Sequence, residues 1–375
     1  MSNIHTSSDA RRLAQKRLPW MVFDYIDGSA GEGHAEAENR RQLKALQLQP
    51  RVLNNVENRS VAVQFFGELA RLPFGISPVG MCNLSSPHAD RWLAKLAAKH
   101  NIPCGVSTAA SSSLESMATW SEGRACFQLY FSGNEDSSRA LIERAAAADY
   151  RTLILTVDVP EVGRRPRELR RGFKMPFSMG PAQVFDFAMH PRWSLNTLRH
   201  GRPELANFGG QFGAFERTAS RAGADWSLLE RIRQLWKGNL VVKGVLSTDD
   251  AVRMQGMGVD AVQVSSHGGR QLDSGPAPID CLRHIRQAVG DSYPLFFDSG
   301  LRSGEDIVKA YACGANFVFM ARPLLFAMAA EGNAGLHQLT QVLSDETSIT
   351  LAQLGLNSLN DVSSDVLYRP AGSLS

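Results

Sequence analysis

The sequence has few cysteines, and none are spaced for a disulfide framework or a metal site. The five, Cys82, Cys104, Cys126, Cys281 and Cys313, are scattered without CxxC spacing, most of them in apolar runs. We therefore expect reduced core residues and no bound metal. No GxGxxG follows a candidate strand and no GxxxxGK[ST] occurs, which argues against a Rossmann dinucleotide site and a P-loop.

Long apolar runs and a strong charge imbalance are missing too. Nothing approaches the roughly 18 to 20 apolar residues of a membrane-spanning helix. The polar N-terminus lacks the apolar core of a signal peptide, so we expect folding in the cytoplasm. The 40 Lys and Arg residues against 37 Asp and Glu leave a net charge of only +3, which gives no general reason to expect nucleic-acid binding.

What the sequence does contain is eight short apolar runs, most of them followed by an amphipathic segment. The runs do not alternate polar and apolar residues, as expected of strands buried on both faces. Eight such units favour a single-domain α/β fold, a closed (β/α)8 TIM barrel, over an open sheet. The predicted strands are 74–80, 102–108, 125–131, 152–158, 239–245, 261–266, 295–300 and 317–322.

Two stretches fall outside this repeat. Residues 1–73 contain helical segments and are expected to form an N-terminal cap on a barrel that spans 74–330. Residues 159–226 form an insertion after the fourth strand that is too long for a plain connection, and such insertions usually carry function. Residues 331–375 are expected to form C-terminal helices and a tail.

Polar or conformationally special residues stand at the end of nearly every predicted strand. The C-terminal strand ends of a barrel converge on one face, where active sites lie. Contact with solvent explains any one of these residues equally well, but the agreement across eight strands indicates a site. The residues are Pro78, Gly80, Ser107, Gln128, Tyr130, Thr156, Asp158, Lys243, Ser265, His267, Asp298 and Arg322.

The strongest local signal is VSSHGGRQLD at 264–273. The strand delivers His267, and two glycines let the backbone turn so that Arg270 can face the same site. A base beside a carboxylate-binding guanidinium is the pair that oxidation of a hydroxy acid needs. Asp158 could orient the imidazole and stabilise its protonated form. Taken alone, the motif could be a structural turn and Asp158 the cap of a loop.

A second cluster follows the seventh and eighth strands, with DSGLRSG at 298–304 and MARP at 320–323. Barrels often bind a phosphate there through loop amides and a helix N-terminus. Arg302 and Arg322 would supply positive charge. Because dinucleotide motifs are missing, we expect the phosphate to belong to a mononucleotide cofactor.

With these motifs, the sequence resembles the family of FMN-dependent 2-hydroxy-acid dehydrogenases and oxidases from about residue 10 to 360. KRLPWMVFDYIDG, QLY, LTVDVPEVGRR, VVKGV, SSHGGRQLD and DSGLRSG occur in family order. The segment 190–207 is similar to the mandelate dehydrogenase branch, and the lactate dehydrogenases are the branch with the next strongest resemblance. The resemblance implies FMN as cofactor.

The resemblance also implies roles for individual residues. His267 would be the general base and Asp158 its partner, while Tyr25, Tyr130, Arg165 and Arg270 would contact the substrate. The implied FMN contacts are Pro78, Val79, Gly80, Ser107, Gln128, Thr156, Lys243, Ser265, Asp298, Ser299, Gly300, Arg302, Ala321 and Arg322.

Three positions depart from the family pattern. The family usually has Asn at Ser266 and Gly at Ala321, where the added methyl would lie close to the phosphate; we expect FMN binding to survive both changes. Glycolate oxidase carries a bulky aromatic at the position of Ala109. A small residue there, beside Gly80, leaves room for a larger substrate side chain.

The expected activity is oxidation of an (S)-2-hydroxy acid, foremost (S)-mandelate, to the 2-oxo acid. Whether His267 takes the hydroxyl proton or the Cα proton stays open, because both routes use the same residues. The alternatives are an L-lactate dehydrogenase and a soluble 2-hydroxy-acid oxidase that uses O2. A non-redox FMN isomerase and a catalytically silent flavoprotein also fit the fold.

Residues 177–215 combine apolar and basic side chains, with only Asp186 and Glu204 as acids. An active-site lid or a subunit contact would explain this composition. The resemblance instead implies a monotopic anchor on the cytoplasmic face of the inner membrane, with electrons passed to a membrane quinone. It also implies a homotetramer, and a soluble cytoplasmic enzyme is the alternative.

Overall fold

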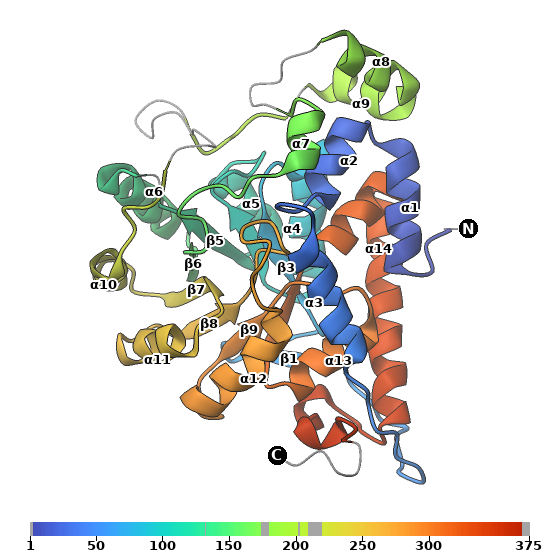
Figure 1. The fold of residues 1–375 in the computed structure, drawn as a ribbon, viewed down its shortest axis with the longest axis vertical. Helices are drawn as coiled ribbons and strands as arrows, with labels where there is room; N and C mark the ends of the chain where they lie inside the picture. Colours follow the sequence, from blue (N-terminus) through green and yellow to red (C-terminus); the bar gives the residue numbers. More distant parts are fainter. Residues whose placement is uncertain (1–2, 132, 174–179, 202, 209–219, 370–375) are drawn as a thin grey trace.

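The computed structural model describes residues 3–131, 133–173, 180–201, 203–208 and 220–369. Eight parallel strands close into a barrel in the order β10, β3, β4, β5, β6, β7, β8, β9. Each predicted run contains one strand, so the predicted (β/α)8 barrel is confirmed (Figure 1). The strands are β3 (Gly75–Val79), β4 (Cys104–Ser107), β5 (Ala125–Tyr130), β6 (Thr152–Thr156), β7 (Asn239–Val245), β8 (Ala261–Val264), β9 (Leu295–Phe297) and β10 (Phe317–Met320).

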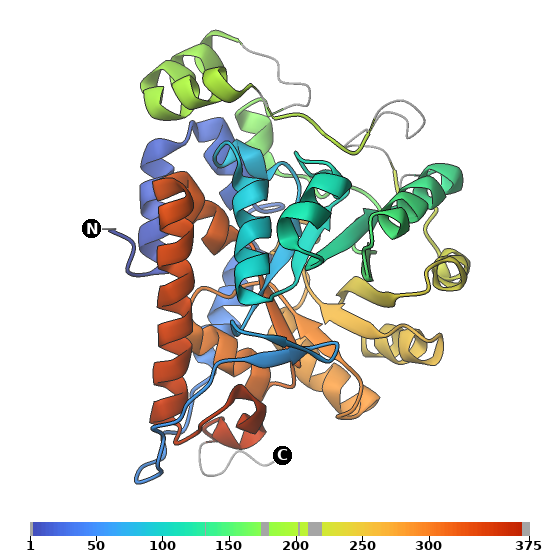
Figure 2. The same ribbon diagram turned by 180° about the vertical axis from the view of Figure 1, so that it is seen from behind.

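One helix of the outer ring follows each strand, which buries the apolar outer faces of the strands (Figure 2). The last of these helices is long and changes direction at Glu331 and Gly332, whose backbone angles are not helical. The ring consists of α4 (Ala89–His100), α5 (Leu114–Ser121), α6 (Glu135–Ala147), α10 (Trp226–Leu235), α11 (Thr248–Gly256), α12 (Pro278–Val289), α13 (Gly304–Ala312) and α14 (Arg322–Gln353).

The segment before the barrel contributes to both of its ends. An unpredicted hairpin of β1 (Val63–Phe65) and β2 (Glu68–Ala70) closes the N-terminal end, where Phe65 packs on Phe296, Phe317 and Phe319. Of the helices of this segment, the first two pack against α14 and the third against α12 and α13 (Figure 1). They are α1 (Ser7–Arg17), α2 (Trp20–Asp27) and α3 (His34–Ala45); short turns of helix are η1 (Cys82–Leu84), η3 (Leu359–Asp361) and η4 (Ser364–Val366).

The insertion after β6 contains α7 (Pro166–Arg170), α8 (Pro181–Met189) and α9 (Pro191–His200). The hairpin of α8 and α9 lies next to α2 (Figure 1). Asp186 is buried and accepts hydrogen bonds from the backbone amides of Trp20 (3.1 Å) and Met21 (3.4 Å). These first-turn amides have no partner within the helix, so a carboxylate from the insertion caps α2.

The hairpin makes a second contact with the catalytic end. The indole Nε1 of Trp193 donates to the carbonyl of Leu84, 2.8 Å away, just beyond the loop that follows β3. The hairpin is therefore fixed to two elements that border the site, α2 and the β3 loop.

Candidate active site

An open cavity lies at the C-terminal ends of the strands. Most residues that the sequence predicted for the site line it. They are Tyr25, Pro78, Val79, Gly80, Ser107, Tyr130, Arg165, Lys243, His267, Arg270, Asp298, Ser299, Gly300, Arg302, Ala321 and Arg322. The other four, Gln128, Thr156, Asp158 and Ser265, stand at the ends of the same strands or just beyond them.

His267 stands three residues after β8 at the start of a tight turn. His267, Gly268 and Gly269 all have positive φ angles, of 55°, 67° and 73°, and glycine adopts this conformation at little cost. The imidazole Nδ1 lies 3.0 Å from a carboxylate oxygen of Asp158, and Nε2 lies 3.3 Å from the hydroxyl of Tyr130. When Nδ1–H donates a hydrogen bond to Asp158, the neutral ring presents Nε2 to the cavity as a proton acceptor.

Burial and charge act in opposite directions on this pair. Burial lowers the pKa of His267 below its usual value, although Asp158 partly offsets the effect. Burial would raise the pKa of Asp158, but the charge of His267, its hydrogen bond and Lys243 together lower it. The pair is therefore a neutral imidazole beside a carboxylate at neutral pH, the form that a general base needs.

Two arginines meet around one buried carboxylate that the sequence interpretation missed. Glu168 lies 2.8 Å from Arg270 Nη2 and 3.7 Å from Arg165 Nη1. Arg270 also donates to the carbonyls of Tyr25 and Gly28, and Arg165 to the carbonyl of Arg270. These contacts fix the guanidinium groups in the cavity wall, where they can bind a carboxylate. The spacing of three residues between Arg165 and Glu168 was the available signal.

The rest of the cavity mouth is largely apolar. Tyr25 donates its hydroxyl to the carbonyl of Gly80 (3.0 Å), and its ring stacks on Phe173 at 4.7 Å. A Cβ added at Gly80 would lie 3.1 Å from the Cβ of Ala109, so these two small residues face each other. Val159, Val162 and Leu205 complete this wall. The wall suits a substrate with an apolar side chain.

Buried polar atoms at the barrel axis fit a planar heterocycle such as that of FMN. Gln128 Nε2 and Thr156 Oγ1 are buried and have no hydrogen-bond partner among the described residues. Such atoms are costly unless a ligand or water pairs with them. Nearby, Lys243 Nζ contacts Ser265 Oγ (2.7 Å) and Asp298 (3.1 Å). Unpaired polar atoms and the positive charge of Lys243 thus lie at the strand ends to which the resemblance assigns the isoalloxazine ring.

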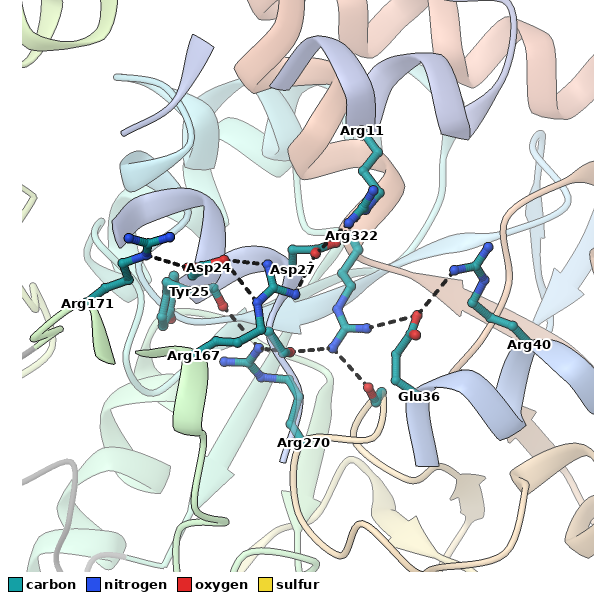
Figure 3. Close-up of polar contacts among 12 residues, drawn as sticks. Arg11, Asp24, Tyr25, Asp27, Glu36, Arg40, Arg167, Arg171, Arg270 and Arg322 are labelled. Atoms are coloured by element: carbon teal, nitrogen blue, oxygen red, sulfur yellow. Dashed lines mark hydrogen bonds and ion pairs between the residues drawn. The ribbon is translucent and has the colours of Figure 1, made fainter. Parts of the chain in front are cut away.

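The loops after β9 and β10 form the second half of the cavity. Ser299 and Gly300 have positive φ angles, and Ser299 Oγ accepts from the amide of Gly268. Arg322 donates to the carbonyls of Gly28 and Gly268 (Figure 3). Arg302 lines the same cavity. Burial lowers the pKa of Arg322 to about 9, and its neighbours Arg270 and Arg302 act in the same direction. The donor set fits a phosphate group.

This combination of a closed barrel and a base beside carboxylate- and phosphate-binding groups defines a flavin-dependent oxidoreductase. The family model of FMN-dependent dehydrogenases matches residues 14–369. The chain therefore belongs to this family of FMN enzymes that oxidise 2-hydroxy acids, as the resemblance predicted.

Individual relatives agree with this assignment. The chain is 38% identical to (S)-mandelate dehydrogenase of Pseudomonas putida, with 97% of this chain and 94% of the relative covered. It is 34% identical to L-lactate dehydrogenase of Pseudomonas syringae pv. syringae (strain B728a), with 98% and 99% covered.

Solved structures give the same picture. A crystal structure of the monotopic membrane protein (S)-mandelate dehydrogenase superposes with a TM-score of 0.93 at 37% identity, covering 98% of this chain and all of that one. A mandelate oxidase structure gives 0.82 at 32% identity, covering 96% and 97%. Among the described residues, no helix is both long enough and apolar enough to span a membrane.

Proposed function

We propose that the protein oxidises (S)-2-hydroxy acids to 2-oxo acids, with (S)-mandelate as its main substrate. One observation carries this proposal: a partly buried His267–Asp158 pair lies at the same cavity as two arginines fixed around Glu168. A proton acceptor and a carboxylate-binding pair on one wall are what this reaction requires.

Each group would then have a defined task. Arg165 and Arg270 hold the substrate carboxylate, and His267 Nε2 takes a proton from the substrate while Asp158 stabilises the imidazolium that forms. Tyr25 and Tyr130 flank the reacting carbon. FMN supplies a two-electron acceptor when it is bound.

The same proposal assigns the cofactor contacts. Gln128, Thr156 and Lys243 would hold the ring, and Arg302 and Arg322 the phosphate. The remaining implied FMN contacts, on the loops after β3, β4, β8, β9 and β10, would surround the cofactor between these two ends.

The facing pair of Ala109 and Gly80 makes substrate size testable. We expect Ala109→Trp to lower kcat/KM for (S)-mandelate by about tenfold or more and for L-lactate by much less, because the indole would fill the space of the phenyl ring. The measurement is anaerobic flavin reduction with mandelate, lactate, glycolate and long-chain 2-hydroxy acids. Equal losses of kcat/KM for mandelate and lactate would show that the space beside Ala109 does not hold the phenyl ring. If no 2-hydroxy acid reduces the wild-type flavin, the proposed activity is wrong.

We further propose that α8 and α9 bind the cytoplasmic face of the inner membrane and that the electrons go to a membrane quinone. Val184, Phe185, Met189, Leu195 and Leu198 are each more than half exposed on these helices. The support is that Asp186, the only acid of the hairpin, is buried, so its exposed face combines apolar with basic groups. Phe177, Met179, Arg202 and 209–215 of the predicted segment lie outside the described residues.

This surface gives a second test. Replacing Phe185, Leu195 and Leu198 together with Ser should release the protein from anionic vesicles in a flotation assay, while artificial dyes still reoxidise its flavin. The control is Val52→Ser, which removes an apolar side chain as exposed as that of Leu198 from the segment between α3 and β1, at the other end of the molecule (Figure 1). If the wild-type protein does not bind the vesicles and its reduced flavin is reoxidised rapidly in air, the protein is instead a soluble oxidase.

A further inference from the structure

A carboxylate contacts both Arg302 and Arg322, in the half of the cavity that the loops after β9 and β10 form. Glu36, in the first turn of α3, lies 3.2 Å from Arg302 Nη2 and 3.7 Å from Arg322 Nη1. Figure 3 shows its carboxylate between Arg322 and Arg40, which is 3.9 Å away on the same helix. No motif in the sequence indicated this residue, because it stands 266 positions from Arg302.

The backbone holds Glu36 in this place. A Cβ at Gly269 would come within 2.5 Å of the Glu36 amide nitrogen, so the His267 loop and the start of α3 are in close contact. Arg322 is tied to the same loop through the carbonyl of Gly268, 2.9 Å away. The backbone of Glu36 and the guanidinium of Arg322 are therefore fixed to the same loop, and the Glu36 side chain is only 22% exposed.

The negative charge of Glu36 affects how well this site can bind a phosphate. The guanidinium groups of Arg302 and Arg322 carry two positive charges, and Glu36 cancels one of them. A phosphate monoester carries about −1.5 to −2 at neutral pH. It would therefore meet a site with only about half of the positive charge that the two arginines offer, and it would lie close to a like charge.

We propose that Glu36 is an internal competitor of the FMN phosphate, which must displace its carboxylate from Arg302 and Arg322. Arg40 is the partner to which the displaced carboxylate can turn, since it already lies within ion-pair distance one helical turn away. Glu36 thereby sets the affinity for FMN and the preference for FMN over unphosphorylated riboflavin. The inference rests on the proposed assignment of Arg302 and Arg322 to the phosphate.

The test is to titrate flavin-free protein, prepared from the holoenzyme, with FMN and with riboflavin, and to measure free flavin after ultrafiltration. We expect Glu36→Gln to tighten FMN binding by about tenfold and to leave riboflavin binding unchanged. The matched control is Glu38→Gln, which removes the same charge from the same helix but breaks only contacts with Arg41 and Gln42. It should change neither ligand.

A second pair of variants tests the route of displacement. Arg40→Gln should weaken FMN binding by about twofold when Glu36 is present and have no effect in the Glu36→Gln background. If flavin-free Glu36→Gln proves unstable, the rate of FMN release from its diluted holoenzyme should still fall relative to wild type.

The outcomes separate the two hypotheses. If Glu36→Gln weakens FMN binding or leaves it unchanged while Arg302→Gln weakens it, the competitor is refuted and the phosphate site stands. If Arg302→Gln leaves the ratio of FMN to riboflavin affinity as in wild type, the phosphate assignment itself is wrong.

Discussion

Replacing His267 with Gln should leave FMN bound and slow its reduction by substrate roughly 10²- to 10⁴-fold or more, the usual loss when a positioned base is removed. Glutamine keeps much of the size of imidazole but cannot take a proton. Stopped-flow anaerobic reduction with (S)-mandelate measures this step directly. Reduction at the wild-type rate would show that His267 is not the base.

The double variant with Asp158→Asn sharpens this test. If Asp158 acts through His267, as proposed, removing both should cost about as much as removing His267 alone. Additive losses would mean that Asp158 contributes through another group.

Asp158→Asn alone should lower kcat/KM by about 10² to 10⁴, because an amide can neither stabilise the imidazolium charge nor favour the right tautomer as strongly. The geometry can persist, since the amide oxygen can still accept a hydrogen bond from Nδ1–H over the 3.0 Å separation. An unchanged kcat/KM would contradict the role of Asp158.

The pH dependence supplies a readout that a folding defect would not reproduce. The base works when it is deprotonated, so kcat/KM should fall as the pH drops through the pKa of His267. That pKa lies below the ordinary 6.5, so the wild-type profile should stay flat into mildly acidic pH. Asp158 raises the pKa of His267, so its loss should move the acid limb to still lower pH. A shift to higher pH would contradict the electrostatic role of Asp158.

Much of the fold could be predicted because its elements carry local signals. Each barrel strand is buried on both faces and therefore forms a continuous apolar run such as 152–158. The hairpin of β1 and β2 gave no such signal, since three-residue strands containing Gln64 and Glu68 are too short to show a period.

The residues of the site also fall into those with a local sequence signal and those without one. Residues at strand ends, such as His267 and Asp158, could be grouped because a barrel brings all strand ends to one face. Glu36 and the contact of Glu168 with Arg270 could not, because Arg270, Arg302 and Arg322 come from segments far away in the sequence. Ion pairs of this kind depend on tertiary packing that no local pattern encodes.

The cap that Asp186 places on α2 has a consequence for anyone who wishes to produce this enzyme without detergent. Excising the whole hairpin would remove the exposed apolar face, but it would also strip the acceptor from the amides of Trp20 and Met21, at the start of the helix that carries Tyr25. Losing a cap typically costs about 0.5 to 2 kcal/mol of stability. If the hairpin is the proposed membrane anchor, a shortened enzyme would need no detergent but would have a lower melting temperature, whereas substitutions on the exposed face alone would keep the Asp186 cap on α2.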